Sequence, residues 1–271
     1  MIDIQKRKNL SDTMAALAKN DTVVAFSGGA DSSLVLKLAR EAAKKDGTRV
    51  TAVMLHTALH PVGEVSVARS VARDCGADFE VIEVDELAEA GIENNPVDRC
   101  YRCKHTLFSK LVDLAREKGA GAVLDGTNAD DLLVYRPGLK ALDELGVKSP
   151  LKDAGLSKAD VRDLAREYNV SVADRPSAPC LATRFPYGTP LNRKALDQVA
   201  AGENALRCFG FYNLRLRVYG DMVRLEVDAK DLGVVMANRE AIVAVLKKNG
   251  YRTIALDLEG FRSGSFDEGL K

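Results

Sequence analysis

Short apolar runs alternate with segments of helical spacing over the first two thirds of the chain. The apolar runs predict buried strands at 23–26, 50–55, 79–84, 122–125 and 147–151. Between them, apolar residues recur every three or four positions, which predicts helices at 4–19, 34–42, 62–75, 107–115 and 158–168. Strands that alternate with helices form right-handed parallel crossovers. The pattern therefore predicts an α/β fold, a parallel sheet with helices on both faces.

The last third of the chain has a different order of elements. The pattern predicts helices at 193–208 and 239–248 and strands at 214–219, 223–227 and 253–258. Helix, hairpin, helix and strand in this order predict a small α+β domain. We therefore expect two domains, residues 1–184 and residues 185–271.

The charge balance argues against a long nucleic acid as a partner. Lys and Arg together number 39 among the 271 residues, as do Asp and Glu, so the formal net charge is zero. Because nucleic-acid binding rests on excess positive charge, a small anionic substrate suits this chain better. No apolar stretch approaches the roughly 20 residues of a membrane span, and the first residues lack a signal-peptide core, so we expect a cytoplasmic protein without membrane contact. Of the five cysteines, Cys75 and Cys208 are expected to pack in the core.

A loop of small polar residues follows the first predicted strand. Gly28 and Gly29 permit a turn and let a ligand approach the backbone, while Ser27, Ser32 and Ser33 offer hydroxyl donors at the start of a helix. Helix N–H groups at the carboxyl end of a parallel strand form a site for phosphate oxygens. No lysine follows the glycines, which separates the loop from G-x-x-x-x-G-K-[ST]. An ordinary turn rich in small residues is the alternative.

The run Ser-Gly-Gly-Ala-Asp-Ser at 27–32 resembles the pyrophosphate loop of the ATP pyrophosphatase (PP-loop) superfamily. Members of this superfamily adenylylate a substrate oxygen and release pyrophosphate before a nucleophile displaces AMP. The resemblance implies that the phosphates of ATP are bound by Ser27, Gly28, Gly29, Asp31 and Ser32. It also implies that Asp31 lies near the Mg²⁺.

Two further polar positions follow predicted strands. Asn128 and Asp130 come just after the fourth strand, where related proteins often show an acidic turn, and they could contact ribose or magnesium. A solvated turn is the alternative. His56 ends the second strand, where it could touch the nucleotide or serve as a packing or capping residue.

Cys100 and Cys103 form a C-x-x-C at the start of a predicted helix. The helix N-terminus and the neighbouring Arg99, Arg102 and Lys104 would offset the charge of two thiolates. This spacing is typical of a redox pair, half of a zinc site or part of an iron–sulfur site. Two unrelated core cysteines remain the alternative, and the lack of a second C-x-x-C argues against a closed four-cysteine site.

Cys180 lies in a proline-rich loop, residues 174–188, which is expected to be ordered without being helix or strand. Arg175 and Arg184 flank it, and this cationic setting favours a thiolate. Loops of this kind between domains often carry active sites. A domain linker with an incidental cysteine is the alternative.

Two arginines alternate with apolar residues along the strand 214–219. Arg215 and Arg217 therefore lie on one face and suit a phosphate. Glu203 and Glu226 could orient these arginines or bind a metal. A solvated strand face is the alternative.

Three segments together resemble the LarE family of ATP-dependent sulfur transferases over nearly the whole chain. They are Asn-Pro-x-x-Arg-Cys-Tyr-x-Cys-Lys at 95–104, Pro-Cys-Leu-Ala-Thr-Arg-Phe-Pro-Tyr-Gly at 179–188 and Gly-Phe-Arg-Ser-Gly at 260–264. The resemblance implies that a carboxylate of a pyridinium-biscarboxylate mononucleotide is adenylylated and then converted to a thiocarboxylate. These enzymes act in making the nickel-pincer nucleotide cofactor.

The LarE family uses two sulfur chemistries. In one branch, the cysteine that matches Cys180 attacks the acyl adenylate, gives up its sulfur and becomes dehydroalanine. In the other branch, cysteines matching Cys100, Cys103 and Cys180 bind a [4Fe-4S] cluster with one open iron, which can carry a sulfide. Since this sequence has all three cysteines, the resemblance implies the cluster-dependent reaction, with Cys180 as a cluster ligand.

The resemblance also implies the substrate pocket and the partners. Arg215 and Arg217 would bind the substrate phosphate, Arg184 would lie near the substrate, and Glu203 and Glu226 would belong to the same pocket. The expected partners are the small-molecule nucleotide and sulfide or another sulfur donor. We also expect a homo-oligomer.

Three other functions are compatible with parts of the sequence. A transfer RNA thiolation enzyme shares the pyrophosphate loop, but the zero net charge and the short second domain argue against it. A glutamine-dependent synthase with an N-terminal amidotransferase would need a cysteine where Ile2 stands. A nucleotide or redox sensor would bind ATP without releasing AMP or pyrophosphate.

Overall fold

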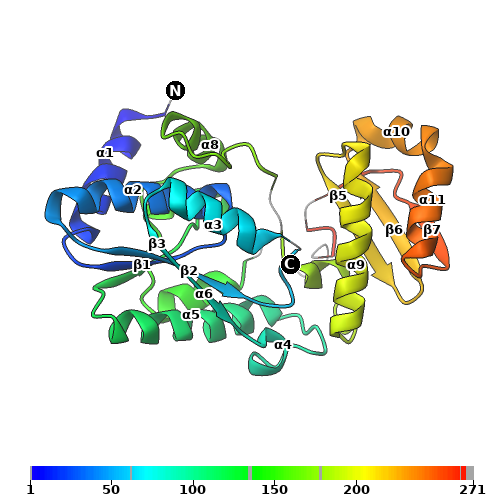
Figure 1. The fold of residues 1–271 in the computed structure, drawn as a ribbon, viewed down its shortest axis with the longest axis horizontal. Helices are drawn as coiled ribbons and strands as arrows, with labels where there is room; N and C mark the ends of the chain where they lie inside the picture. Colours follow the sequence, from blue (N-terminus) through cyan, green and yellow to red (C-terminus); the bar gives the residue numbers. More distant parts are fainter. Residues whose placement is uncertain (1, 62, 134–135, 177–178, 263, 267–271) are drawn as a thin grey trace. The chain divides into compact units, whose positions relative to one another are not determined.

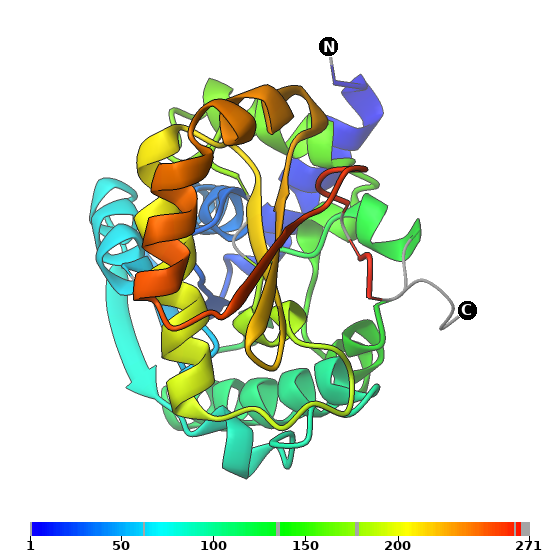
Figure 2. The same cartoon turned by 90° about the vertical axis from the view of Figure 1, so that its right-hand side faces the viewer.

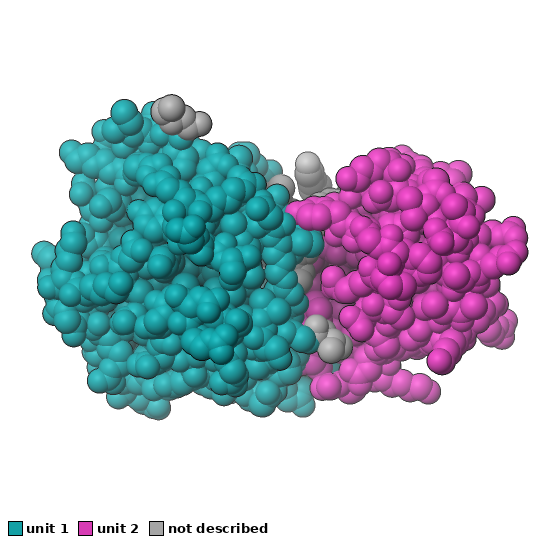
Figure 3. Space-filling view, turned by 45° about the horizontal axis from the view of Figure 1, so that its top comes forward, with its two compact units in different colours: residues 1–57, 63–90, 98–177 teal, residues 58–62, 91–97, 178–271 magenta. Residues whose placement is uncertain are grey.

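A computed structural model describes residues 2–61, 63–133, 136–176, 179–262 and 264–266. The contacts divide the chain into two compact units, coloured separately in Figure 3. Unit 1 comprises Met1–Thr57, Gly63–Ala90 and Asp98–Ser177, and unit 2 comprises Ala58–Val62, Gly91–Val97 and Ala178–Lys271. The domain boundary expected after residue 184 stays a prediction, although by contact residues 178–184 belong with unit 2.

Unit 1 is built on a four-stranded parallel sheet. Its strands lie in the order β3-β2-β1-β4 and are β1 (Thr22–Ala25), β2 (Val50–His56), β3 (Asp78–Glu83) and β4 (Ala122–Leu124). In the register, Thr22 lies opposite both Val50 and Ala122. Strands β1 and β2 are almost continuously apolar because helices bury both of their faces. The sheet confirms four of the five strands predicted for this part of the chain.

Helices cover both faces of this sheet (Figure 1). One core cluster contains Val24 and Met54 of the strands, and the other contains Val23 and Val53, because successive side chains point to opposite faces. The helices of the first cluster include α1 (Ile4–Leu17), α2 (Ala30–Asp46), α3 (Glu64–Asp74) and α8 (Lys158–Glu167). The helices of the second are α5 (Arg99–Glu117) and α6 (Gly138–Glu144). The predicted α/β class is therefore confirmed.

The fifth strand predicted in this part, at 147–151, is wrong. Lys148 makes only an isolated parallel bridge to Leu124, and the helix α7 (Pro150–Asp153) begins two residues later. Pro150 lacks the N–H that a strand ladder needs, and its fixed φ suits the first helical turn. The short elements α4 (Glu86–Glu89), α6 and η1 (Ala129–Leu133) were not predicted from the sequence, since so few residues show no periodicity. Val62, in the helix expected from 62, lies outside the described residues.

Unit 2 contains a small mixed sheet with helices (Figure 2). Its strands are β5 (Leu214–Tyr219), β6 (Met222–Val227) and β7 (Thr253–Leu256). β6 pairs antiparallel with β5 and parallel with β7, and the parallel pair needs a crossover. The helices are α9 (Arg193–Leu206), α10 (Leu232–Ala237) and α11 (Arg239–Lys248), with 3-10 turns η2 (Leu181–Arg184), η3 (Arg207–Phe209) and η4 (Ala229–Asp231). The expected α+β order is confirmed, with α10 added.

Helix α9 packs closely on the sheet of unit 2 at a glycine. A Cβ on Gly202 would lie 2.7 Å from Cδ1 of Leu216 on β5, so a larger residue there would require the Leu216 side chain to move.

None of the described helices is long and apolar enough to span a membrane.

Candidate functional site

The loop between β1 and α2 requires glycine. Gly28 has a φ of 72°, which residues with a side chain rarely adopt, and a Cβ there would lie 2.9 Å from Cα of Ala68 on α3. Gly29 is the N-cap of α2 and has no side chain to cap the first turn. The backbone at the start of α2 is therefore open to an anion, as expected for a phosphate site.

The serines of this loop bond to one another. Ser27 Oγ lies 3.2 Å from Ser32 Oγ, and the backbone N–H of Gly29 donates to Ser27 Oγ at 3.4 Å. Ser27 is exposed, whereas Ser33 is completely buried. Hydroxyls that pair with each other can turn to donate to a phosphate oxygen, so the loop can exchange these long bonds for bonds to a ligand.

Asp31 lies in the first turn of α2 with one oxygen paired and one unpaired. Its Oδ2 contacts the ammonium of Lys158 at the start of α8. Its Oδ1 is buried and has no hydrogen-bond partner among the described residues. Burial raises the pKa of Asp31 more than Lys158 lowers it. An unpaired carboxylate oxygen beside a phosphate site is a fitting ligand for Mg²⁺.

The end of β4 packs directly against this turn. A Cβ on Gly126 would lie 2.7 Å from the backbone nitrogen of Ser32. The buried carboxylate of Asp125 accepts hydrogen bonds from the Thr127 hydroxyl at 2.5 Å and from the Ser149 hydroxyl at 2.6 Å. The two loops at the carboxyl edge of the sheet therefore form one surface, the usual place for ligands in open α/β sheets.

Asn128 and Asp130 shape the second of these loops. The side-chain oxygen of Asn128 accepts from the N–H of Asp130 at 3.0 Å, and Asp130 Oδ2 accepts from the backbone N–H of Lys158 at 2.9 Å. Asp130 thus joins this loop to the first residue of α8. The predicted contacts of these two residues with ribose or magnesium stay predictions.

Lys158 is the residue of this site that sequence reasoning missed. The sequence predicted the helix that Lys158 begins, and the structure shows a capping box between Ser157 and Asp160 at its start. Nothing in the sequence pairs Lys158 with Asp31, 127 residues earlier. Only the packing of α8 beside α2 brings the two side chains together.

Cys100 and Cys103 lie one turn apart at the start of α5, in unit 1. Cys100 is exposed and Cys103 half-buried. Next to them, Lys104 places its ammonium 3.6 Å from Asp125 Oδ2, and burial lowers the pKa of this lysine. A Cβ on Gly138 would lie 2.8 Å from Cδ of Lys104 and 3.1 Å from the carbonyl oxygen of Cys100, so α6 packs tightly on this turn. Lys104 therefore links the C-x-x-C helix to the carboxyl edge of the sheet.

The backbone around Cys180, in unit 2, is fixed by hydrogen bonds. Its carbonyl accepts from the N–H of Thr183 at 3.1 Å and from the Thr183 hydroxyl at 2.8 Å. Arg184 donates to the Thr183 hydroxyl at 2.8 Å and to the carbonyl of Pro179 at 3.2 Å. Cys180 itself is half-buried. Specific contacts therefore order the described part of this loop. This argues against the alternative of a linker with an incidental cysteine.

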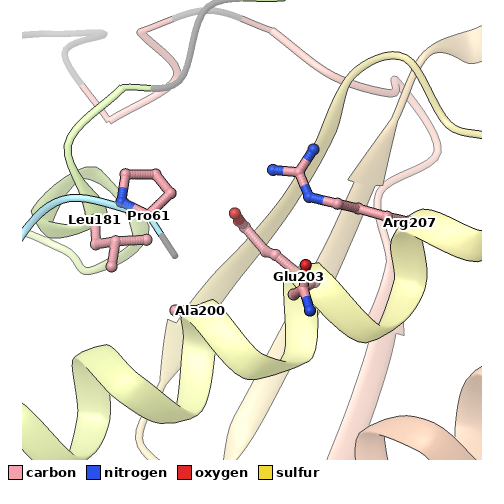
Figure 4. Close-up of a pocket in the computed structure, with 6 residues that line it drawn as sticks. Pro61, Leu181, Ala200, Glu203 and Arg207 are labelled. Atoms are coloured by element: carbon pink, nitrogen blue, oxygen red, sulfur yellow. The ribbon is translucent and has the colours of Figure 1, made fainter. Parts of the chain in front are cut away.

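Arg184 and Glu203 form a buried ion pair beneath this loop. The two bonds from Arg184 Nε and Nη2 to the carboxylate measure 2.8 and 2.9 Å, and Glu203 Oε1 also accepts from the N–H of Leu216 at 2.9 Å. The Arg184 side chain is 1% exposed, so it acts on the loop rather than on a solvent-borne ligand. Figure 4 shows Glu203 of α9 and Arg207 of η3 projecting into a small pocket, which is also lined by Pro61, Leu181, Ala200 and Asn204. With a volume of about 10 Å³ the pocket suits one water, not a nucleotide.

Arg215 and Arg217 are both buried on β5. Arg217 Nε donates to Glu226 Oε2 at 2.9 Å, and its Nη1 donates to the carbonyl of Thr183, close to Cys180. Arg224 pairs with the other oxygen of Glu226 at 2.8 Å. A solvated strand face, the alternative for these arginines, is therefore wrong. Burial is possible because the carboxylates of unit 2 neutralise most of the charge.

Arg215 is a buried cation among other charged side chains of unit 2. Arg215 lies under the ring of Phe261 and opposite Glu226 across the sheet. Burial, and next the nearby Arg184, lower its pKa to about 10. The other charges that act on it are those of Glu203, Arg217 and Glu226, and its Nη1 donates to the carbonyl of Leu214 at 2.8 Å. An anion bound beside Arg215 would offset the cost of burying this cation.

Three side chains remain from the sequence analysis. His56 Nδ1 lies 2.8 Å from Glu83 Oε2, a pair that joins the ends of β2 and β3. Cys75 is half-buried against the core, as expected. The expected burial of Cys208 is wrong, because this cysteine is exposed in η3 and its thiol donates to the carbonyl of Ala205. The amphipathic pattern of α9 does not continue into this 3-10 turn, which changes the direction of the side chains.

No group of three or more His, Cys, Asp or Glu side chains within the described residues is arranged to hold a metal ion. Cys100 and Cys103 belong to unit 1 and Cys180 to unit 2, so each thiol site is described within its own unit. The three-cysteine cluster stays a prediction.

This chain is similar to known proteins along most of its length. The pyridinium-3,5-bisthiocarboxylic acid mononucleotide synthase of Lactiplantibacillus plantarum is 39% identical over 247 residues, which cover 91% of this chain and 89% of that protein. The chain belongs to the LarE family. It also matches the asparagine synthase family of PP-loop proteins over residues 6–198. It is therefore an ATP-using sulfur transferase.

Two further relatives of this LarE protein have lower identity. An uncharacterized protein of Synechocystis sp. is 34% identical over 267 residues, which cover 98% of both chains. A tRNA-specific 2-thiouridylase of Methylobacterium nodulans is 28% identical over 232 residues, which cover 69% of this chain and 59% of that enzyme. The similarity to LarE thus extends over both units, whereas the similarity to the tRNA enzyme covers less of either chain.

Proposed function

We propose that this protein uses ATP to adenylylate a carboxylate of a pyridinium-biscarboxylate mononucleotide and then converts it to a thiocarboxylate in nickel-pincer nucleotide cofactor biosynthesis. In the first step a carboxylate oxygen attacks the α-phosphorus, and pyrophosphate leaves. In the second, sulfur attacks the acyl carbon, and AMP leaves. The observation that carries the proposal is the loop of β1 and α2, with its open backbone and the unpaired oxygen of Asp31, in a chain similar to a synthase of this product class.

In this proposal the residues of unit 1 bind ATP. Ser27, Gly28, Gly29 and Ser32 hold the pyrophosphate with their hydroxyls and backbone N–H groups. Asp31 offers its unpaired Oδ1 to Mg²⁺. The bonds that Asn128 and Asp130 make within their loop support its shape at the edge where the ribose would lie.

The buried arginines of unit 2 bind the substrate phosphate in this proposal. Arg215 supplies a buried guanidinium group, with Arg217 beside it on the same strand. Arg184, Glu203 and Glu226 order these groups and the Cys180 loop through their ion pairs. The Arg184 side chain is 1% exposed. In this proposal it therefore orders the loop instead of contacting the substrate directly, as the sequence had suggested.

For sulfur, we propose that Cys100, Cys103 and Cys180 bind a [4Fe-4S] cluster. Thiolates are the ligands such a cluster takes, and the N-terminus of α5 favours the negative charge of Cys100 and Cys103. When bound through three cysteines, the cluster supplies an open iron that can carry sulfide. The second candidate is the same reaction with Cys180 as the sacrificed sulfur donor. It is supported by the fixed backbone around this residue.

Transfer RNA thiolation is a weaker candidate. Its support is the 28% identity to a tRNA-specific 2-thiouridylase, and the zero net charge argues against it. The cytoplasmic location, the homo-oligomer and the source of sulfur stay predictions.

Anaerobic purification with iron and sulfide analysis separates the two sulfur routes. We expect the reconstituted wild type to contain a cluster that is lost in Cys100→Ala, Cys103→Ala and Cys180→Ala, with Cys208→Ala as the matched control that keeps it. A wild type that binds no iron after reconstitution would contradict the cluster. A loss of ~34 Da from the protein at Cys180 after turnover, the mass of hydrogen sulfide, would show that this residue is the donor.

A further inference from the structure

We propose that Lys158 binds a phosphate group of ATP, and that it pairs with Asp31 only until the nucleotide and its Mg²⁺ arrive. When they bind, Asp31 contacts the metal instead of Lys158, and Lys158 contacts the phosphate instead of Asp31. This inference rests on the proposed role of the 27–32 loop as the ATP site. It adds a cation to a loop that has no lysine of its own.

The backbone of Lys158 is held in place from two sides. It is the first residue of α8, whose start is fixed by the capping box of Ser157 and Asp160. Its N–H donates to Asp130 Oδ2 at 2.9 Å, from the loop that follows β4. The side chain then reaches Asp31 on α2. Lys158 thus touches both loops that form the proposed ATP site.

The side chain of Lys158 is positioned to change partners. It is 34% exposed, so a ligand can reach its ammonium, and four methylene groups let the charge swing while the backbone stays fixed. Burial raises the pKa of Asp31, and the charges of Lys158 and of Arg162, one helical turn further along α8, act against this rise. Two cations thus act on Asp31, and they favour an anion nearby.

The state of Asp31 gives the exchange a physical reason. One of its oxygens is occupied by Lys158, and the other is buried without a partner in the described structure. A divalent cation would satisfy both oxygens better than a single ammonium, and would release Lys158 beside the arriving phosphates. Each charge keeps a partner of opposite sign before and after binding, so neither step leaves a bare buried charge.

Nucleotide binding without turnover tests the exchange. The probe is Mg²⁺ with α,β-methylene ATP, in which the α–β link cannot be cleaved, titrated into the full chain by calorimetry. We expect Lys158→Met to raise the dissociation constant about tenfold to a hundredfold, the loss of one hydrogen bond to a charged group. Lys158→Arg, which keeps the charge, is expected to restore part of the affinity.

Lys118→Met is the matched control. Lys118 is 33% exposed and pairs with Glu80 at 2.7 Å in the same unit, which closely resembles the setting of Lys158. The affinity of Lys118→Met for the ATP analogue is expected to stay within about threefold of wild type, since no phosphate contact is lost. Equal affinity in wild type and Lys158→Met would overturn the role of Lys158 and leave the ATP site standing. A wild type that binds no analogue would overturn both.

Thermal unfolding without nucleotide tests the resting pair. Lys158→Met leaves Asp31 without its cation, so we expect a lower Tm, and we expect Asp31→Asn in the same chain to recover part of the loss. If the second substitution recovers nothing, the pair does not neutralise Asp31 in the resting state, and the exchange is wrong.

Discussion

Breaking the buried pair of Arg184 and Glu203 tests how the Cys180 loop is positioned. Arg184→Met removes the two bonds to Glu203, of 2.8 and 2.9 Å, and the bonds to the Thr183 hydroxyl and the Pro179 carbonyl. It also leaves Glu203, 7% exposed at its side chain, as a buried charge without this partner. Breaking such a pair costs about 3–5 kcal/mol, a large fraction of the roughly 5–15 kcal/mol of stability that a domain has.

The assay for this pair has two parts. Urea unfolding followed by circular dichroism suits a chain without tryptophan, and Arg184→Met is expected to shift the transition of unit 2. The rate of alkylation at Cys180, read by mass mapping, is expected to change because the Pro179 carbonyl and the Thr183 hydroxyl, which itself donates to the Cys180 carbonyl, lose their bonds from Arg184. Arg193→Met is the control. The side chains of Arg193 and Asp197, which pair with each other, are 72% and 61% exposed. Such a pair contributes under about 1 kcal/mol to the free energy of unfolding.

Two results would refute this reasoning. If Arg184→Met costs less than about 1 kcal/mol, the pair does not carry the energy of a buried salt bridge. If the alkylation rate of Cys180 stays at the wild-type value, the pair does not position the loop. We also expect Glu203→Gln combined with Arg184→Met to be less damaging than the sum of the two changes, since the double variant removes the unpaired charge.

Three further predictions concern both units. Gly28→Ala would place a Cβ 2.9 Å from the backbone of Ala68 at a residue with a positive φ. We therefore expect a loss of about 1–3 kcal/mol in unfolding free energy and weaker binding of Mg²⁺-nucleotide by calorimetry. Unchanged affinity would mean that the loop does not approach the phosphates. Ser157→Ala removes a helix cap and is expected to cost about 1 kcal/mol in urea unfolding at neutral pH. Burial raises the pKa of Asp160, but its hydrogen bonds, first from Ser157, lower it below the usual value on balance; its stabilising effect is therefore present above the unfolded pKa and lost as the pH falls through the folded pKa. A cost of Ser157→Ala that did not shrink in acid would contradict this capping box. Arg215→Met is expected to weaken binding of a pyridinium mononucleotide about tenfold or more, while Arg215→Lys weakens it less; equal binding of the phosphate-free nucleoside by wild type and Arg215→Met is the control.

The parts of the fold that depend on local pattern could be predicted from the sequence. Neighbouring residues alone specify the buried strands β1 and β2 and the Ser157 cap of α8. The error at 147–151 came from treating an apolar run as a strand although Pro150 interrupts its hydrogen bonding. A proline inside a short apolar run therefore argues against a strand.

Contacts between distant segments could not be predicted. The pairing of Lys158 with Asp31 requires α8 to lie beside α2, which neither segment encodes alone. The burial of Arg217 depends on Glu226 across the hairpin, and an alternating charged strand commonly signals solvent instead. Charges on a strand can be buried when the paired strand supplies opposite charges at matching positions.

The product of a single incubation tests the central claim most directly. The anaerobically reconstituted protein is mixed with ATP, Mg²⁺, sulfide and the pyridinium-biscarboxylate mononucleotide, and the nucleotide is analysed by mass spectrometry. The account predicts a product in which oxygen of a carboxylate has been replaced by sulfur, with AMP and pyrophosphate formed in equal amounts. An unchanged nucleotide in a sample that binds ATP and substrate would contradict it.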